Sequence, residues 1–180
     1  MNGPELQKRL LEKHEGFIKE IQQLSDNDFL LSVNGKWTAG QQLDHIVRSV
    51  GPVKLAFSFP NFALTLIFGK ANRPSRTYDG LIEKYNQKLA SGGRASGRFI
   101  PNDVGVTSRN PLQKKLSTLV NSLNSRIKKK SEEQLDTYIL PHPLLGKLTL
   151  REMLYFTIYH VEHHHKQMLA HLRNQTIERY

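Results

Sequence analysis

The residues best suited to chemistry are histidines, and four of the chain's eight lie within six positions, at His160, His163, His164 and His165. On a helix, His160 and His164 share one face, with Cβ atoms about 5–6 Å apart. Two imidazoles at this spacing can converge on one metal ion, each at about 2.0–2.1 Å. His163 forms a rival pair with His160 at a spacing of three. The cluster therefore indicates a divalent-metal site on a helix, with packing histidines as the alternative interpretation.

Apolar periodicity along the same segment does not settle which histidines face inward. A stripe of apolar residues recurs at helical spacing, and His165 lies nearest its centre at 3.6 residues per turn. The stripe consists of Leu150, Leu154, Ile158, Val161, Met168 and Leu172. His160 and His164 lie on its flank. Taken alone, this pattern predicts that His165 is the buried, hydrogen-bonded core histidine.

Two histidines hold a divalent ion weakly, so a third ligand must come from elsewhere in the chain. The candidates are His14, His45 and His142, with His171 more distant. His45 lies opposite Leu43 and Val47 on its own segment, which favours an exposed side chain. It reaches a metal only if the polar face of that segment lines a cavity.

Four helical segments are predicted, and strand signals are scarce. The first spans Pro4–Leu24, and the second begins at the capping pattern Thr38-x-x-Gln41 and kinks or ends at Gly51-Pro52. The third opens at Asn110-Pro111 and closes at Lys128–Lys130. The fourth opens at a capping box, Thr149 to Glu152, and runs to about Asn174. We therefore predict an all-α fold, an antiparallel four-helix bundle in one domain of residues 1–180.

A long connection, Lys70 to Asn110, separates the second and third segments. It contains eight basic and three acidic residues, so it carries a net charge of +5, half of the chain's +10. A short helix is predicted within it, at Tyr78–Leu89. Connections of this length are usually lids or mobile segments. The apolar stretch before it, Gly51–Gly69, carries Lys54, Pro60 and Asn61, so we predict a buried helix or a dimer interface there and no membrane span.

Composition removes several classes of protein. The chain's 180 residues suit one domain, and the absence of cysteine excludes disulfides, thiolate zinc sites and a cysteine nucleophile. The first residues lack the apolar core of a signal peptide, so we expect a cytoplasmic protein. The positive charge permits a different class, a non-catalytic basic module that binds nucleic acid or a protein partner. No recognised nucleic-acid motif accompanies the charge, and loss of DNA retention with rising salt would test it.

Two stretches together resemble the DinB/YfiT-like family of metal-binding helical bundles. These are WTAGQQLDHI, at residues 37–46, and LTLREMLYFTIYHVEHHHKQM, about a hundred residues later. The resemblance implies an antiparallel four-helix bundle, often dimeric, with His45, His160 and His164 as metal ligands. His163 and His165 match no ligand position in that pattern. The connection from Lys70 to Asn110 is longer than the family pattern requires, which leaves the substrate open.

A three-histidine site leaves coordination positions free for water or substrate, the arrangement of catalytic rather than structural sites. Zinc and nickel both suit imidazole ligands. One predicted activity on a small-molecule substrate is metal-dependent hydrolysis of an amide or ester, for which Asp44 and Glu162 are the nearest carboxylates in sequence. Glu162 points away from the ligand face. The other is transfer of a low-molecular-weight thiol, which the resemblance supports at least as well, with connection Lys and Arg binding the thiol's carboxylates. Trp37 is assigned to packing.

Overall fold

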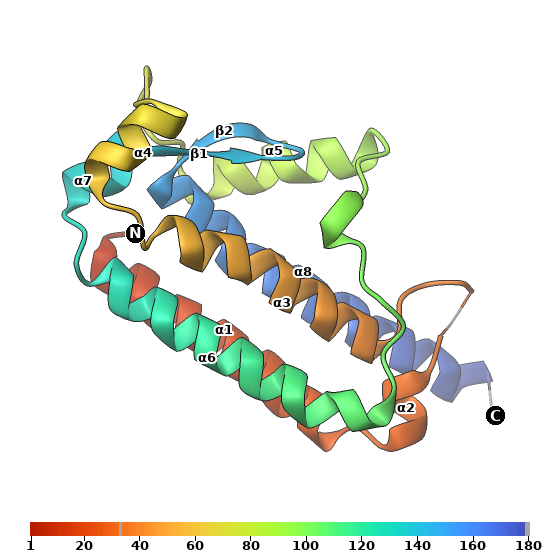
Figure 1. The fold of residues 1–180 in the computed structure, drawn as a ribbon. Helices are drawn as coiled ribbons and strands as arrows, with labels where there is room; N and C mark the ends of the chain where they lie inside the picture. The colour runs from red at the N-terminus through yellow and green to blue at the C-terminus, as the bar shows by residue number, and fades with distance from the viewer. Residues whose placement is uncertain (33, 179–180) are drawn as a thin grey trace.

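The computed structural model describes residues 1–32 and 34–178, with side chains described as far as Arg173. The chain is mostly helical in this range, as the all-α prediction requires. Its four long helices are α1 (Gly3–Gln23), α3 (Ala39–Ala56), α6 (Arg109–Ile127) and α8 (Leu150–Glu178). Helix α1 packs on α6 and α8, and α3 packs on the same two helices (Figure 1). The core lies between these four helices.

Local capping patterns set where three of the long helices begin. Thr38 accepts a hydrogen bond from the backbone N–H of Gln41, and the Gln41 side chain accepts one from the backbone N–H of Thr38. The same reciprocal pair joins Thr149 and Glu152 at the start of α8, with distances of 3.0 and 3.1 Å. Asn2 and Glu5 form a third capping box, at α1. These side chains satisfy N–H groups that have no partner within the helix.

Two boundaries differ from the sequence prediction. Helix α6 begins at Arg109, after Ser108 and without a side-chain cap, so Asn110 lies inside the helix and is not its cap. Helix α3 continues through Pro52 to Ala56, so of the two alternatives at Gly51-Pro52, a kink or an end, the end is wrong. Proline removes one hydrogen bond from a helix. Here packing of the surrounding turns outweighs that loss, since Val50, Val53 and Phe57 are all buried.

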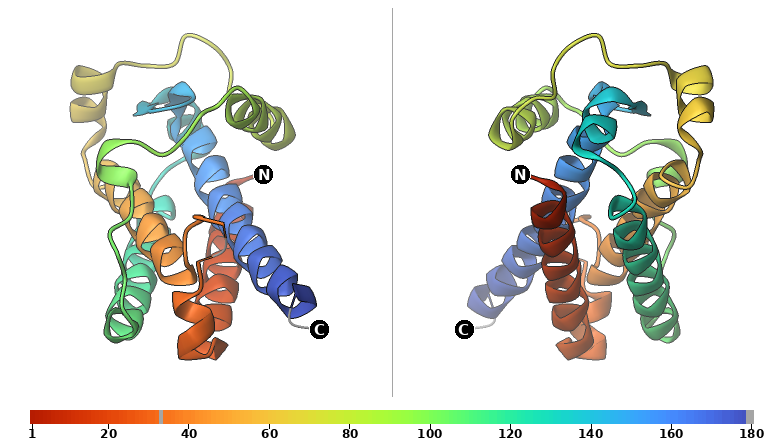
Figure 2. Two further views of the ribbon diagram at one scale, coloured as in Figure 1. Left: turned by 90° about the vertical axis from the view of Figure 1, so that its right-hand side faces the viewer. Right: turned by 90° about the vertical axis from the view of Figure 1, so that its left-hand side faces the viewer.

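Short elements fill the segments between the long helices. They are α2 (Asp26–Leu30), α4 (Asn61–Phe68), α5 (Tyr78–Ala90), η1 (Gly97–Phe99), η2 (Val106–Ser108), α7 (Glu132–Thr137), β1 (Ile139–His142) and β2 (Gly146–Thr149). Helix α5 confirms the short helix predicted at Tyr78–Leu89. Strands β1 and β2 form an antiparallel hairpin, with Leu140 opposite Leu148. Strands of four residues are too short to show alternation, so the sequence gives no signal for this hairpin. Helices α4 and α5 lie at one end of the molecule, on either side of the hairpin (Figure 2).

A buried carboxylate ties the segment before α5 to the start of α8. The Glu152 side chain is fully buried, and Arg73 donates to both of its oxygens at 2.6 and 2.8 Å. Arg76 adds a guanidinium contact at 3.1 Å and a backbone N–H at 2.7 Å. Part of the positive charge of the Lys70–Asn110 connection is therefore used for structure.

The apolar stretch Gly51–Gly69 divides between core and surface. Phe57 and Leu64 are buried, whereas Phe62, Leu66 and Ile67 on α4 are 75%, 85% and 57% exposed. The prediction of a buried helix is thus wrong for one face of α4. No single helix in the described residues is long and apolar enough to cross a membrane. In the same part of the chain, α3 and α4 taken together reach that length and composition, but the pair is bent by 111°.

Candidate metal centre

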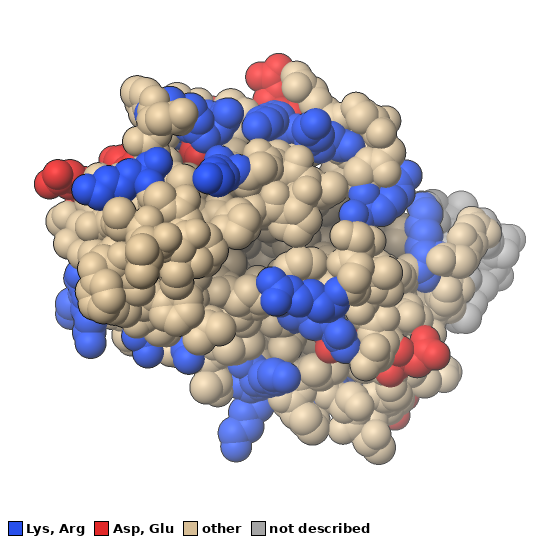
Figure 3. Space-filling view, turned by 45° about the horizontal axis from the view of Figure 1, so that its top comes forward, with Lys and Arg blue, Asp and Glu red and all other residues tan. Residues whose placement is uncertain are grey.

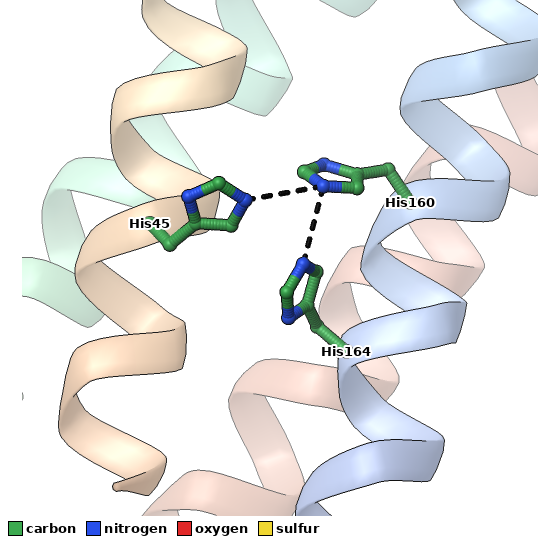
Figure 4. A group of neighbouring side chains, drawn as sticks. All are labelled: His45, His160 and His164. Atoms are coloured by element: carbon green, nitrogen blue, oxygen red, sulfur yellow. Dashed lines mark hydrogen bonds between the residues drawn. The ribbon is translucent and has the colours of Figure 1, made fainter. Parts of the chain in front are cut away.

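The structure brings together three histidines from two helices. His45 projects from α3, and His160 and His164 project from successive turns of α8 toward it (Figure 4). The Nε2 atom of His160 lies 3.1 Å from Nε2 of His45 and 3.2 Å from Nε2 of His164. Among the described residues these three form a group whose ligand atoms all lie within 4.8 Å of one another. The helical pattern alone favoured an exposed His45, but this part of α3 lines a cavity, which is the condition under which His45 was expected to reach a metal.

Hydrogen bonds on the far side of two rings decide which nitrogens face the centre. His45 Nδ1 lies 2.6 Å from the carbonyl oxygen of Phe99, which can only accept, so Nδ1 carries the proton. His164 Nδ1 lies 3.4 Å from Oε1 of Gln42, whose amide nitrogen donates to the Trp37 carbonyl. His164 Nδ1 is therefore also the protonated nitrogen. In both rings the Nε2 lone pair is left facing the centre.

This donor set fits a metal ion. The single proton that His160 Nε2 can carry cannot satisfy two lone pairs at 3.1 and 3.2 Å equally well. A cation among the three nitrogens removes the conflict. The outer partners, the Phe99 carbonyl and the Gln42 amide, are the kind that orient metal-binding imidazoles.

Burial keeps the three imidazoles neutral, which metal binding requires. His45, His160 and His164 are only 4%, 6% and 6% exposed. Desolvation lowers the pKa of His45, although its bond to the Phe99 carbonyl opposes the shift. It lowers the pKa of His160 and of His164 well below the usual value, with further lowering from the neighbouring histidines. Protons therefore compete weakly for this site at neutral pH.

Trp37 covers the cluster. Its ring centroid lies 4.9 Å from that of His45 and 6.1 Å from that of His164, almost parallel to the latter. The assignment of Trp37 to packing at the helix start is therefore incomplete, because the ring also forms one wall of the site. No local signal in the sequence reveals this contact.

A cavity of about 1220 Å³ opens beside the three histidines. It is lined by residues of α3, α5, α8, the hairpin and the segment between α5 and η1. Lys and Arg side chains lie around the hollow on this face of the molecule (Figure 3). Of the basic residues in the Lys70–Asn110 connection, Arg94 and Arg98 reach the cavity among the described residues.

The other histidines fall into two groups. His163, His142 and His171 line the cavity outside the three-histidine group. His142 Nδ1 accepts from the backbone N–H groups of Leu144 and Leu145, and burial lowers the pKa of His142 to about 4.

The second group lies away from the cavity. His14 is buried in α1, where its Nδ1 bonds to the Leu10 carbonyl. His165, predicted to be the buried and hydrogen-bonded histidine, has a side chain 24% exposed. Its buried Nε2 makes no hydrogen bond, so that prediction is wrong.

Both carboxylates singled out in the sequence face away from the cavity. Asp44 accepts from Arg48 at 2.6 Å and from the backbone N–H of Asn102 at 3.0 Å. Glu162 pairs with Lys13 at 3.1 Å and with Lys166 at 2.8 Å. No Asp or Glu lines the cavity within the part of the chain that the structure describes. The described wall therefore offers imidazoles, and no carboxylate, as bases at neutral pH.

Comparison with protein families agrees with this geometry. The family model of the DinB superfamily matches residues 9–168, which include α3, the hairpin and all three clustered histidines. The chain belongs to the DinB superfamily. Comparisons with curated proteins and with solved structures gave no match. For this DinB chain, what the cavity binds has to be argued from its own residues.

Proposed function

We propose that this DinB protein is a metal-dependent transferase of a low-molecular-weight thiol, built on the antiparallel four-helix bundle expected from the sequence. The observation that carries the proposal is the convergence of three neutral imidazoles on one point, at the edge of a cavity whose described lining contains no carboxylate. His45, His160 and His164 would hold zinc or nickel. A divalent ion bound to three neutral ligands keeps its full charge and acidifies a thiol bound beside it.

The cavity suits thiol chemistry better than hydrolysis. Hydrolysis with metal-activated water is commonly assisted by a carboxylate base, as in the His-Glu-x-x-His metalloproteases. Asp44 and Glu162 are engaged by cations elsewhere. A thiol, with a pKa near 8.5, needs less assistance than water to lose its proton.

The chain's own residues supply the remaining roles. His163 lines the cavity beside His164, with ring centroids 5.4 Å apart, and burial lowers its pKa, so it is a neutral imidazole able to accept the thiol proton. Burial raises the pKa of Tyr85 to about 12, which keeps its phenol protonated. Tyr85 can therefore donate a hydrogen bond but not act as a base at neutral pH.

The proposed reaction joins the thiol sulfur to an electrophilic carbon of the second substrate. The sulfur lone pair forms the new C–S bond, the leaving group departs with the electrons of the broken bond, and the thiol proton passes to the imidazole. Arg94, Arg98 and Lys36 on the cavity wall would bind acidic groups of the thiol or of its partner.

Metal content is the first test of this proposal. Untagged protein, purified without a metal column, is measured by mass spectrometry beside His45→Ala, His160→Ala and His164→Ala. His163→Ala is the matched control, because it removes a neighbouring cavity imidazole outside the cluster. We expect about one ion per chain in wild type and in the control, and loss of the ion in the three ligand variants. Wild type that neither carries nor takes up zinc or nickel would overturn the site.

Activity separates the two chemistries. Conjugation of cysteine or glutathione to 1-chloro-2,4-dinitrobenzene releases chloride and a proton, and it is followed by absorbance. Hydrolysis of 4-nitrophenyl acetate is measured in parallel. Metal-dependent conjugation that is lost in His164→Ala, and lowered in His163→Ala although that variant keeps the metal and the fold, supports the transferase. Metal-dependent ester hydrolysis without conjugation would favour a hydrolase instead.

A further inference from the structure

The cavity beside the metal centre has two chemically different ends. His45 meets His160, while Gln42, about one turn earlier on α3, meets His164, one turn later on α8. Helices α3 and α8 therefore run in opposite directions along the cavity. At one end of the cavity, residues from the start of α3 face residues from the later turns of α8. At the other end, residues from the end of α3 face residues from the first turns of α8.

One end and the adjoining wall are cationic and polar. Lys36 and Trp37 precede α3, and Gln167 and His171 lie opposite them on α8. Arg98 belongs beside the metal centre, because the next residue, Phe99, bonds to His45. Within the described residues, neither Lys36 nor the arginines of this wall, Arg94 and Arg98, have a carboxylate partner within salt-bridge distance. Arg94 donates to the carbonyl oxygens of Gly93 and Leu89, and the Arg98 guanidinium lies over the Phe99 ring, so neither contact neutralises the charge that a ligand would meet.

The other end is apolar. Val53 and Ala56 of α3 lie across from Met153 and Phe156 of α8. This wall is extended by Phe59, which precedes α4, by Phe68, the last residue of α4, and by Leu140 of β1. These side chains provide an extended apolar surface, of the kind that buries most of a ligand's area in small-molecule sites.

We propose that the cavity binds an amphiphilic monoanion, a carboxylic acid with an extended hydrocarbon chain. Its head group would lie near Arg94, Arg98 and Lys36, and its chain would lie against Val53, Met153 and Phe156. The volume of about 1220 Å³ exceeds the roughly 300–1,000 Å³ typical of ligand pockets. A small thiol alone would leave the apolar end unfilled. The inference rests on the proposed function only in treating an acid of this class as the second substrate, one that carries on its chain the electrophilic carbon and leaving group that the transfer requires.

Direct binding tests the inference. Decanoate, decan-1-ol and butanoate are titrated calorimetrically into zinc-free and zinc-loaded protein, below their aggregation concentrations. We expect one decanoate per chain, bound at least tenfold more tightly than decan-1-ol, which lacks the charge, and than butanoate, which lacks the chain. Equal affinity for decanoate and decan-1-ol, or for decanoate and butanoate, overturns the proposal.

Variants locate the ligand. Arg94→Gln combined with Arg98→Gln should weaken decanoate binding about tenfold and leave decan-1-ol within twofold. The matched control is Lys114→Gln with Lys115→Gln, two exposed cations on α6, which should change neither affinity. Ala56→Trp should weaken both ligands by filling the apolar end. An arginine pair variant that binds decanoate as wild type does would overturn the placement of the head group.

The zinc-free arm separates this inference from the proposed function. Decanoate selectivity in a protein that takes up neither zinc nor nickel supports the amphiphile site and refutes the metal enzyme. Zinc uptake without decanoate selectivity supports the metal centre and refutes the amphiphile site.

Discussion

The outer partner of His164 offers a sharp test of the metal centre. Gln42 is buried, and its Oε1 accepts from His164 Nδ1 at 3.4 Å, which fixes the ring with Nε2 facing the other two histidines. Gln42→Leu removes this acceptor and leaves the three ligands in place. Gln42→Glu keeps an acceptor at the same position and adds a charge.

The size of the effect follows from the geometry. Loss of an outer partner typically lowers metal affinity 10- to 100-fold, or about 1.4–2.7 kcal/mol of binding free energy. The bond of 3.4 Å is longer than the usual 2.7–3.2 Å. We therefore expect Gln42→Leu to weaken binding about tenfold, at the lower limit. Gln42→Glu should bind at least as tightly as wild type, because a carboxylate makes the imidazole a stronger ligand.

The chain supplies its own reporter. Trp37 is the single tryptophan, and its ring lies 4.9 Å from that of His45. Nickel bound at the three histidines should quench its fluorescence, and the titration midpoint gives the affinity of each variant. His164→Ala should abolish saturable quenching, and His163→Ala should not. A Gln42→Leu midpoint equal to that of wild type would refute the claim that Gln42 orients His164, and unchanged quenching in His164→Ala would place the ion elsewhere.

Three further predictions concern stability and assembly. Burial lowers the pKa of His14 to about 4 from 6.5, so between these values the unfolded chain binds a proton that the folded chain does not, and stability falls as pH falls. At 1.36 kcal/mol per pKa unit, the His14 shift lowers the free energy of unfolding by about 2 kcal/mol at pH 5 and about 3 kcal/mol at pH 4. Urea unfolding at pH 7 and pH 5 should therefore show a smaller loss of stability on acidification in His14→Leu than in wild type. Equal losses in the two proteins would contradict this assignment to His14. Glu152→Ala should lower the free energy of unfolding by about 3 kcal/mol, since it removes the buried partner of Arg73 and Arg76 and half of a capping box. The control is Glu12→Ala, at an exposed glutamate. A loss below about 1 kcal/mol in thermal or urea unfolding would show that the Glu152 ion pairs contribute little to stability. The homodimer remains a prediction, in which the exposed face of α4 is the interface. Leu66→Glu, at a position 85% exposed, should then shift the mass measured by sedimentation toward that of the monomer without lowering stability. An unchanged mass would show that α4 does not form the interface.

Features that depend on neighbouring residues were predictable from the sequence. The capping pairs Thr38–Gln41 and Thr149–Glu152 are three residues apart, and both form as expected. The spacing of His160 and His164 is equally local, because four residues nearly complete one helical turn. Family resemblance added His45, which its own helical pattern placed on the exposed side.

The errors arise where distant elements meet. A single apolar stripe implies one buried face, and on that assumption His165 was placed in the core. Helix α8 instead packs against α1 on one side and against α3 and α5 on others, so residues flanking the stripe, His160 and His164, are the buried ones. The local signal at Pro52 is likewise outweighed by packing, whereas at Asn110 the difference is that α6 begins earlier, at Arg109, after Ser108.

The tertiary structure alone decided what surrounds the histidines. The carbonyl that fixes His45 belongs to Phe99, 54 residues away, and the cavity wall combines α3, α5, α8 and the hairpin. The basic connection divides between Arg73 and Arg76, which bind Glu152, and Arg94 and Arg98, which face the cavity. Composition gives these four arginines the same charge. Only their positions in the fold distinguish them, because a charge stabilises the chain or binds a ligand according to which groups lie within a few ångströms of it.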